Sequence, residues 1–305
     1  MKTWTKGVLF VFVAALISGI SIFFNKFAVS GINSDVFAFL KNLIVGILLF
    51  SVIILFYKFK ELKKLTNKQW LRLSFIGLIG GAIPFILFFR GLKLISASTG
   101  SLIHKMMFLF VAVLAIFYLK ERVNKAFFIT AVLLVLGNAL LLGYYFSGFG
   151  VGFGELLVLT ATLFWAVETV ISKKLLKHLD ANIVAFGRMF FGSLFILAFL
   201  IFTDQFRFIF SMDASQISWV LFTSALLFGY VFFWYNGLKN VSATFATQIL
   251  LIGAPVTTLF NYAFLGAAVP VSKFVGLGLI LSVLALSVFL ESKLNKRTFS
   301  AVNRS

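Results

Sequence analysis

The sequence predicts an all-α integral membrane protein in which ten transmembrane helices form a 5+5 inverted-topology repeat, with both termini in the cytoplasm. Composition is the first observation that predicts this fold class. The 305 residues are 61% hydrophobic and 12% charged, with a mean hydropathy of +1.08, which indicates a polytopic membrane protein. The other two observations are an internal repeat and the placement of basic residues in alternate loops.

Ten apolar runs are long enough to cross a bilayer, because a spanning helix needs about 20 mostly apolar residues. They cover residues 7–29, 36–57, 72–90, 96–118, 126–145, 151–172, 183–203, 216–236, 243–264 and 273–290. The first run follows Lys2 and Lys6 as a signal peptide would. It is long enough to span, however, and its repeat mate is internal, so we expect it to be retained as the first helix.

The two halves of the chain repeat each other. The segment GLKLISAS at 91–98 returns as GLKNVSAT at 237–244, 146 positions later. The segment DVFAFLK at 35–41 returns as NIVAFGR at 182–188, 147 positions later. A repeated unit with an odd number of spans is inverted in the membrane the second time, and inverted repeats are a common architecture of carriers with alternating access.

The repeat divides the chain into four parts. Residues 1–146 form the first five-helix unit, 147–154 a glycine-rich connector, 155–293 the second five-helix unit and 294–305 a basic cytoplasmic tail. The connecting segments are short and carry no phosphate-binding P-loop pattern. We therefore expect transport to be driven by gradients rather than by bound ATP.

The formal net charge of +18 is explained by membrane orientation. Most Lys and Arg residues fall in alternate loops, which the positive-inside rule places in the cytoplasm. Only five lie near the other face: Lys26, Arg90, Lys93, Arg207 and Lys273. The expected partners are thus membrane lipids and a small-molecule substrate, with no nucleic acid, in a plasma or inner membrane. A monomer is compatible with the sequence.

Metal and redox chemistry find little support in the composition. The chain has no Cys and two His residues, so thiolate sites and His-rich metal sites are excluded. We expect no metal, no cofactor and no catalytic residue. The one His/carboxylate cluster, His178 with Asp180, falls in a basic loop, where we interpret it as a solvated turn rather than the site of an intramembrane enzyme.

Ionisable residues inside the apolar runs are the strongest functional candidates, because each is costly in hydrocarbon unless it faces protein or water. They are Lys41, His104, Lys105, Glu168 and Arg188. His104 and Lys105 lie about nine residues into the fourth run, roughly 13 Å deep by the helical rise. Glu168 shares a helical face with Trp165 and is the expected counter-ion for Lys105 or Arg188.

Polar residues of the fourth and ninth runs are expected to face each other across a cavity. Ser101 shares a face with Lys105, its repeat mate is Thr247, and Gln248 lies next to that mate. An internal salt bridge that only holds helices together is the alternative. The predicted substrate-binding residues are therefore His104, Lys105, Trp165, Glu168, Gln248, Ser101 and Thr247.

Three further residues are assigned structural or gating roles. Lys41 and Arg188 are repeat mates, each about five residues into the second run of its half, where it could snorkel or cap a helix end. Pro255 interrupts the ninth run and so marks a hinge or a cavity, a tolerated kink being the alternative.

Several of these features together resemble the drug/metabolite transporter (DMT) superfamily, specifically its paired EamA domains. They are the five-plus-five arrangement, the small-residue-rich fourth and ninth runs, Pro255 and the segment LKER at 119–122. The family's leucine–glycine–glutamate turn is matched at Glu121, with Lys120 in place of glycine, and the repeat mate of Glu121 is Ala267. The resemblance implies a carrier with a central cavity that moves amino acids, sugar phosphates, nucleotide sugars or other small metabolites.

The expected function is therefore gradient-driven export or exchange of a small anionic or zwitterionic metabolite, such as an amino acid, by alternating access. Cationic residues outnumber Glu168 in the apolar runs, which favours such a substrate over a quaternary cation. Trp165 and the 42 Phe residues would accommodate an apolar or aromatic portion. A lipid-linked sugar flippase is the main alternative.

Overall fold

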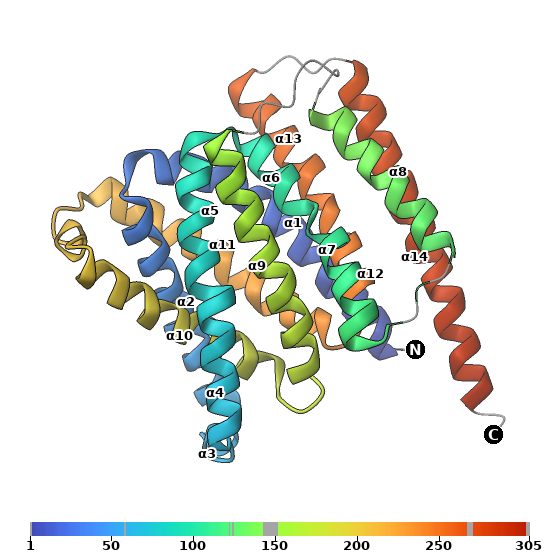
Figure 1. Cartoon of the computed structure of the whole chain (residues 1–305), viewed down its shortest axis with the longest axis horizontal. Coiled ribbons are helices and arrows are strands. Elements are labelled where there is room, and N and C mark those ends of the chain that lie inside the picture. The colour runs from blue at the N-terminus through green and yellow to red at the C-terminus, as the bar shows by residue number, and fades with distance from the viewer. Residues whose placement is uncertain are drawn as a thin grey trace.

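The computed structural model describes residues 2–57, 59–121, 123, 125–142, 152–266 and 271–302. The regular elements of this part of the chain are all helices (Figure 1). In chain order they are α1 (Lys2–Gly31), α2 (Ser34–Tyr57), α3 (Lys60–Lys63), α4 (Asn67–Ile76), η1 (Gly77–Ala82), α5 (Ile83–Leu94), α6 (Ala97–Lys105), α7 (Met107–Leu114), η2 (Ala115–Leu119), α8 (Lys125–Leu142), α9 (Phe153–Leu175), α10 (Ala181–Phe202), η3 (Phe206–Ile209), α11 (Ala214–Leu238), α12 (Ala243–Ile249), η4 (Leu250–Ile252), α13 (Gly253–Leu265) and α14 (Val271–Val302).

Some predicted features lie outside the described residues. These include most of the glycine-rich connector, and also Arg122 and Ala267 of the two turn motifs. The backbone of the predicted basic tail continues α14 as far as Val302.

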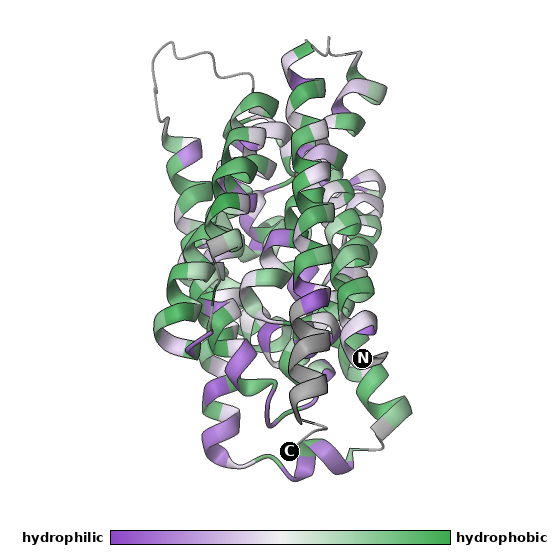
Figure 2. Ribbon diagram, turned by 90° about the vertical axis from the view of Figure 1, so that its right-hand side faces the viewer, coloured by the Kyte–Doolittle hydropathy of each residue, from purple (hydrophilic) through white to green (hydrophobic). Residues whose placement is uncertain are grey.

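Nine helical stretches of the described residues are long and apolar enough to cross a membrane. They are Thr3–Gly31, Ser34–Phe56, Asn67–Leu94, Ala97–Leu119, Phe153–Leu175, Ala181–Phe202, Ala214–Leu238, Ala243–Leu265 and Val271–Lys293. The predicted fifth run corresponds to a shorter apolar helix, Ala126–Leu141. Hydrophobic residues cover most of the height of the bundle, and hydrophilic residues gather at its lower end (Figure 2). This distribution is typical of a bundle surrounded by lipid.

The helices pack in pairs that join the two halves of the chain. The most extensive contacts are those of α1 with α11, α2 with α10, α5 with α9 and α8 with α14. Figure 1 shows α8 beside α14 at one edge of the bundle. Small residues allow close approach within a pair, since a Cβ on Gly91 of α5 would lie 2.7 Å from the carbonyl oxygen of Gly154 on α9. The two halves therefore interleave.

Polar side chains fix the points at which several helices begin, by accepting hydrogen bonds from unpaired backbone N–H groups. The capping residues are Asn33 on α2, Ser96 on α6, Asp180 on α10 and Ser242 on α12. Because its carboxylate accepts a bond of 2.8 Å from the backbone of Asn182, Asp180 acts as a helix cap.

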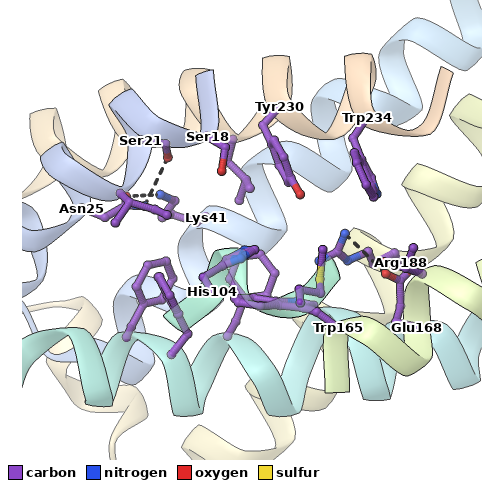
Figure 3. Close-up of a pocket in the computed structure, with 17 residues that line it drawn as sticks. Ser18, Ser21, Asn25, Lys41, His104, Trp165, Glu168, Arg188, Tyr230 and Trp234 are labelled. Carbon is purple, nitrogen blue, oxygen red and sulfur yellow. Dashed lines mark hydrogen bonds and ion pairs between the residues drawn. The ribbon is translucent and has the colours of Figure 1, made fainter. Parts of the chain in front are cut away.

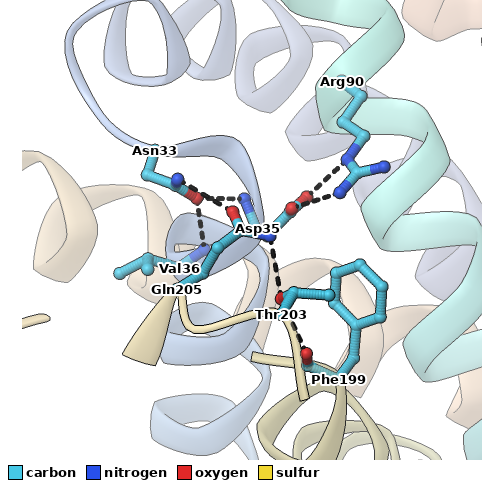
Figure 4. Close-up of polar contacts among 7 residues, drawn as sticks. All are labelled: Asn33, Asp35, Val36, Arg90, Phe199, Thr203 and Gln205. Atoms are coloured by element: carbon cyan, nitrogen blue, oxygen red, sulfur yellow. Dashed lines mark hydrogen bonds and ion pairs between the residues drawn. The ribbon is translucent and has the colours of Figure 1, made fainter. Parts of the chain in front are cut away.

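An ion pair joins α2 to α5 at the end of the bundle away from α3 (Figure 4). Arg90 donates from Nε and Nη2 to the two carboxylate oxygens of Asp35, at 2.8 and 2.5 Å. This bidentate geometry is the strong form of a charged hydrogen bond. Nearby, Asn33 donates to the side-chain oxygen of Gln205 at 3.0 Å and so ties the start of α2 to the segment after α10.

The turn that follows η2 carries backbone strain at Lys120. Its φ is 55°, in the left-handed region, whereas the corresponding position after α13 is Gly266 with a φ of 61°. A side chain in this region costs about 1 kcal/mol relative to glycine. The left-handed backbone at this position explains why the family's turn motif has glycine there. Lys120 adopts the same conformation with strain.

We expect Lys120→Gly to stabilise the protein by up to about 1 kcal/mol, because glycine adopts the left-handed conformation without strain. Thermal unfolding of the detergent-purified protein measures the effect. Lys68→Gly is the control, since Lys68 lies in helical α4, and it should leave the melting temperature unchanged or lower it. A lower melting temperature for Lys120→Gly than for the wild type would contradict the strain argument.

Candidate functional site

A largely buried cavity lies between α1, α2, α5, α9, α10 and α11, with contributions from α6 and α7. Its volume is about 580 Å³ when its open part is included. The lining residues are Ser18, Ser21, Ile22, Asn25, Lys41, Phe85, Phe88, Phe89, His104, Met107, Trp165, Glu168, Thr169, Arg188, Leu227, Tyr230 and Trp234. In Figure 3, Tyr230 and Trp234 reach in opposite His104 and Trp165. Lys41 lies near one end of this central cavity, and Glu168 and Arg188 lie near the other.

The carbonyl of Gly80 holds two of these side chains in place. Pro84 has no N–H group, so the carbonyl four residues before it lacks its helical partner. The chain responds with a π-helical turn, η1, over Gly77–Ala82. The freed Gly80 oxygen accepts from Trp165 Nε1 at 2.9 Å and from Arg188 Nε at 3.1 Å. A proline and a glycine of the third span thereby position Trp165 and Arg188.

Glu168 is the centre of a polar network at one end of the central cavity. Its Oε1 accepts from Ser172 Oγ at 2.5 Å and also from the hydroxyl of Tyr235. Its Oε2 lies 3.9 Å from Nη1 of Arg188, and both side chains of this pair are buried, 1% and 4% exposed. Oε1 thus accepts two hydrogen bonds, and Oε2 has a charged neighbour in Arg188. Of the two counter-ions predicted for Glu168, the structure places Arg188 beside it.

Lys41 has no carboxylate partner in the part of the chain that the structure describes. Its Nζ donates to Asn25 Oδ1 at 2.5 Å and lies 4.8 and 5.3 Å from the ring centroids of Phe37 and Phe89. Lys41 is 0% exposed and Arg188 3%, so neither side chain snorkels to an end of the bundle. Both line the central cavity instead. Burial of an unpaired ammonium is costly, and cation–π contacts offset only part of that cost.

His104 lines the central cavity, but Lys105 does not. The imidazole stacks on the indole of Trp165, with a centroid distance of 4.8 Å, and its Nδ1 has no hydrogen-bond partner among the described residues. Lys105 points away and donates to Ser18 Oγ at 2.6 Å, packed closely against Gly253. Lys105 therefore reaches the cavity only through Ser18.

Gln248 lines a second cavity, formed by residues of α8, α12 and α14, with a volume of about 930 Å³ including its open part. Its side chain donates to Thr130 Oγ1 at 3.4 Å. Glu121 lies in the same cavity and caps α12 by accepting from the N–H groups of Ala243 and Thr244 at 2.7 and 3.1 Å. Gln248 is thus separated from the predicted residues that line the central cavity, His104, Trp165 and Glu168.

The remaining predicted residues also lie away from the central cavity. Ser101 and Thr257 share a hydrogen bond of 3.0 Å between their hydroxyls, and Thr247 bonds to the backbone carbonyl of Ala243 in its own helix, also at 3.0 Å. Pro255 borders a third cavity, next to Lys273. The polar stripes of the fourth and ninth spans therefore do not face each other across the central cavity.

Sequence reasoning missed the contribution of α11. Tyr230 and Trp234 are four residues apart on one face of this helix and stack with centroids 6.2 Å apart. Tyr235 is 0% exposed, and its hydroxyl reaches Glu168 and Arg188. The sequence feature that could have identified this helix is its cluster Tyr230, Trp234 and Tyr235. Such aromatic side chains carry polar groups that need hydrogen-bond partners when buried.

Charged side chains and aromatic rings together line the central cavity. Two cationic side chains and one engaged carboxylate line it, between walls rich in aromatic rings. The part of the chain that the structure describes contains no group of three His, Asp or Glu residues arranged to hold a metal ion.

Comparison with known proteins identifies the family. The model of the EamA-like transporter family matches the chain twice, over residues 5–143 and 152–289. The chain belongs to the EamA-like transporter family. It is accordingly a multi-pass membrane protein and a transporter of the drug/metabolite type, as its sequence predicts.

Relatives of this EamA protein carry similar names. An uncharacterized transporter of Bacillus subtilis, YoaV, is 25% identical over 94% of this chain and 98% of its own length. The riboflavin transporter ImpX of Fusobacterium nucleatum is 23% identical over 94% of this chain and 99% of its own length. A solved crystal structure shares the fold, with a TM-score of 0.72 and 19% identity, covering 95% of this chain and 99% of that one.

Proposed function

We propose that this EamA-family protein is a gradient-driven secondary transporter of a small anionic or zwitterionic metabolite with an apolar or aromatic portion. The observation that carries the proposal is Lys41, a buried cation in the central cavity with no carboxylate partner among the described residues. A substrate carboxylate or phosphate would supply the missing counter-charge. Trp165, Tyr230 and Trp234 would contact the remainder of the substrate.

Alternating access between two inverted five-helix repeats is the mechanism we infer. The protein would lie in a plasma or inner membrane with both termini on the cytoplasmic side. The two family matches of similar length support the repeat. Equivalent contacts support it too: Lys26 caps the end of α5 through Leu92, and Lys173, 147 positions later, caps the end of α11 through Leu238. The interleaved pairs imply that helix pairs, rather than whole halves, move against each other.

The name of one relative fits the aromatic lining. The Fusobacterium protein is named a riboflavin transporter, and riboflavin contains a flat aromatic ring system. A flat ring is well matched to walls of stacked side chains such as His104 on Trp165 and Tyr230 beside Trp234. This likeness favours a substrate with an aromatic portion over a purely aliphatic one.

Transport by purified protein in vesicles tests the proposal. A panel of anionic and zwitterionic metabolites is first screened for thermal stabilisation, because a ligand of the folded state raises apparent stability. Flux of the best stabiliser down its gradient is then measured. We expect Lys41→Met to lower this flux by about tenfold or more, since it removes a charged contact.

Lys68→Met on the exposed face of α4 is the control and should transport as the wild type does. Wild-type flux by Lys41→Met would contradict the assignment of the site. Scrambling of labelled lipid without movement of any soluble metabolite would favour the flippase alternative instead.

A further inference from the structure

We infer that Ser18, Ser21 and Lys41 form the subsite for the anionic group of the substrate, and that this substrate is an anion rather than a zwitterion. The inference rests on the proposed function and names the substrate class of the same cavity. All three residues line that cavity. Ser18 and Ser21 are three residues apart on α1 and so share one face of the helix.

The hydrogen bonds behind Ser21 fix the direction in which it donates. Lys41 is a donor only, so it must donate to the oxygen of the Asn25 amide, at 2.5 Å. The amide nitrogen of Asn25 then donates to Ser21 Oγ at 3.2 Å. With its oxygen accepting from Asn25, the Ser21 hydroxyl is left as an O–H donor, and among the described residues it donates no hydrogen bond. Lys41, Asn25 and Ser21 thus form a relay that begins at a cation.

A second relay ends at Ser18. Lys105 Nζ donates to Ser18 Oγ at 2.6 Å, and Lys105 is 1% exposed. The Ser18 hydroxyl is therefore also left as a donor at the cavity wall. Two hydroxyl donors, each backed by a buried cation, are the arrangement that stabilises an oxyanion in a water-poor site. Lys105 acts through Ser18 and is a positioning residue.

Few acceptors for a substrate ammonium line the cavity among the described residues. Oε1 of Glu168 is occupied by Ser172 and Tyr235, and its Oε2 lies 3.9 Å from Arg188. The unpartnered Nδ1 of His104 is a neutral acceptor. Figure 3 places His104 between the end of the cavity that holds Lys41 and the end that holds Arg188. An ammonium beside it would be repelled by Lys41, whereas Glu168 balances the charge of Arg188 at the other end, so an anion is favoured over a zwitterion.

Four probes that share one ring system separate the charge classes: indole-3-propionate (anion), tryptophan (zwitterion), indole-3-propionamide (neutral) and tryptamine (cation). Their affinities for the detergent-purified wild type are measured by calorimetry and thermal shift. We expect indole-3-propionate to bind about tenfold more tightly than any of the other three. Equal or tighter binding of tryptophan, or no detectable binding of any probe, would overturn the inference.

Single substitutions test which residues form the subsite for the anionic group. Ser18→Ala, Ser21→Ala and Lys105→Met should each reduce the preference for indole-3-propionate over its amide by several-fold while leaving the affinity for the amide nearly unchanged. A purely structural role would weaken both probes alike. Ser224→Ala is the matched control, because this buried serine does not line the cavity, and it should keep the full preference. An unchanged preference in both Ser18→Ala and Ser21→Ala would overturn the assignment.

Binding in detergent requires no transport. The binding test can therefore contradict this inference, and the flux assay the proposed function, independently of each other. A protein that binds the anion preferentially but moves no solute would contradict the proposed function alone. A protein that transports tryptophan as well as indole-3-propionate would uphold the proposed function and overturn this inference.

Discussion

Replacing Arg188 with methionine is expected to destabilise the protein by about 3–5 kcal/mol and to abolish transport. The substitution leaves Glu168 buried, 1% exposed, without its cationic neighbour at 3.9 Å. Removal of one partner of a buried pair costs far more than the pair contributes, because the remaining charge stays desolvated. Arg188→Met also removes one of the two donors to the freed carbonyl of Gly80, the one at 3.1 Å.

Thermal and denaturant unfolding in detergent measure the loss of stability. The Arg188→Met, Glu168→Gln double variant should recover a large part of it, since neither charge then remains alone. Arg207→Met is the control, because its pair with Asp204 is exposed on both sides, 70% and 82%, and an exposed pair contributes at most about 1 kcal/mol. If Arg188→Met costs no more than Arg207→Met, the buried network does not stabilise the fold.

Burial cost explains why sequence alone located much of the central cavity. An ionisable group in an apolar run must face protein or water, so each one points to the interior. Lys41, His104, Glu168 and Arg188 all line the cavity, and Lys105 reaches it through Ser18. The length and apolar character of the runs likewise predicted the nine spans found among the described residues, because a span must be apolar and its length follows the thickness of the membrane.

The sequence did not predict which helices and side chains contact each other. A repeat shows which positions correspond, but it does not show which helices touch once the halves interleave. Gln248 was expected to face Lys105 across a cavity, whereas α12 and α8 place it in a separate cavity with Thr130. Ser101 was expected opposite Thr247 but pairs with Thr257. These assignments depend on helix packing, which local patterns do not encode.

Aromatic lining residues are also hard to single out in this chain. At 18% aromatic content, Tyr230 and Trp234 do not stand out from the lipid-facing rings. Their polar tips are the only distinction, and it becomes informative once burial is known. The sequence identified the charges of the cavity, and the structure added its aromatic walls and the hydroxyl donors of α1.

Gly80→Ala is expected to have the second large effect, because there is no room for a side chain between η1 and α9. A Cβ at this position would lie 2.3 Å from Cγ of Glu168 and 3.1 Å from its Cδ, where carbon atoms prefer about 3.5–4 Å. Overpacking of this kind typically costs about 1–3 kcal/mol. It would also push Glu168 away from Arg188 and shift the carbonyl that binds Trp165, so transport should fall together with stability.

Gly278→Ala is the matched control for this substitution. Gly278 lies in α14 with no atom within 4 Å of its added Cβ, and alanine there should be neutral or stabilising by up to about 1 kcal/mol. The decisive comparison is a double-mutant cycle, in which Gly80→Ala is introduced into Glu168→Ala. With the clashing side chain removed, Gly80→Ala should cost little. The same cost in both backgrounds would show that the requirement for glycine comes from the π-helical turn itself rather than from the close approach of Glu168.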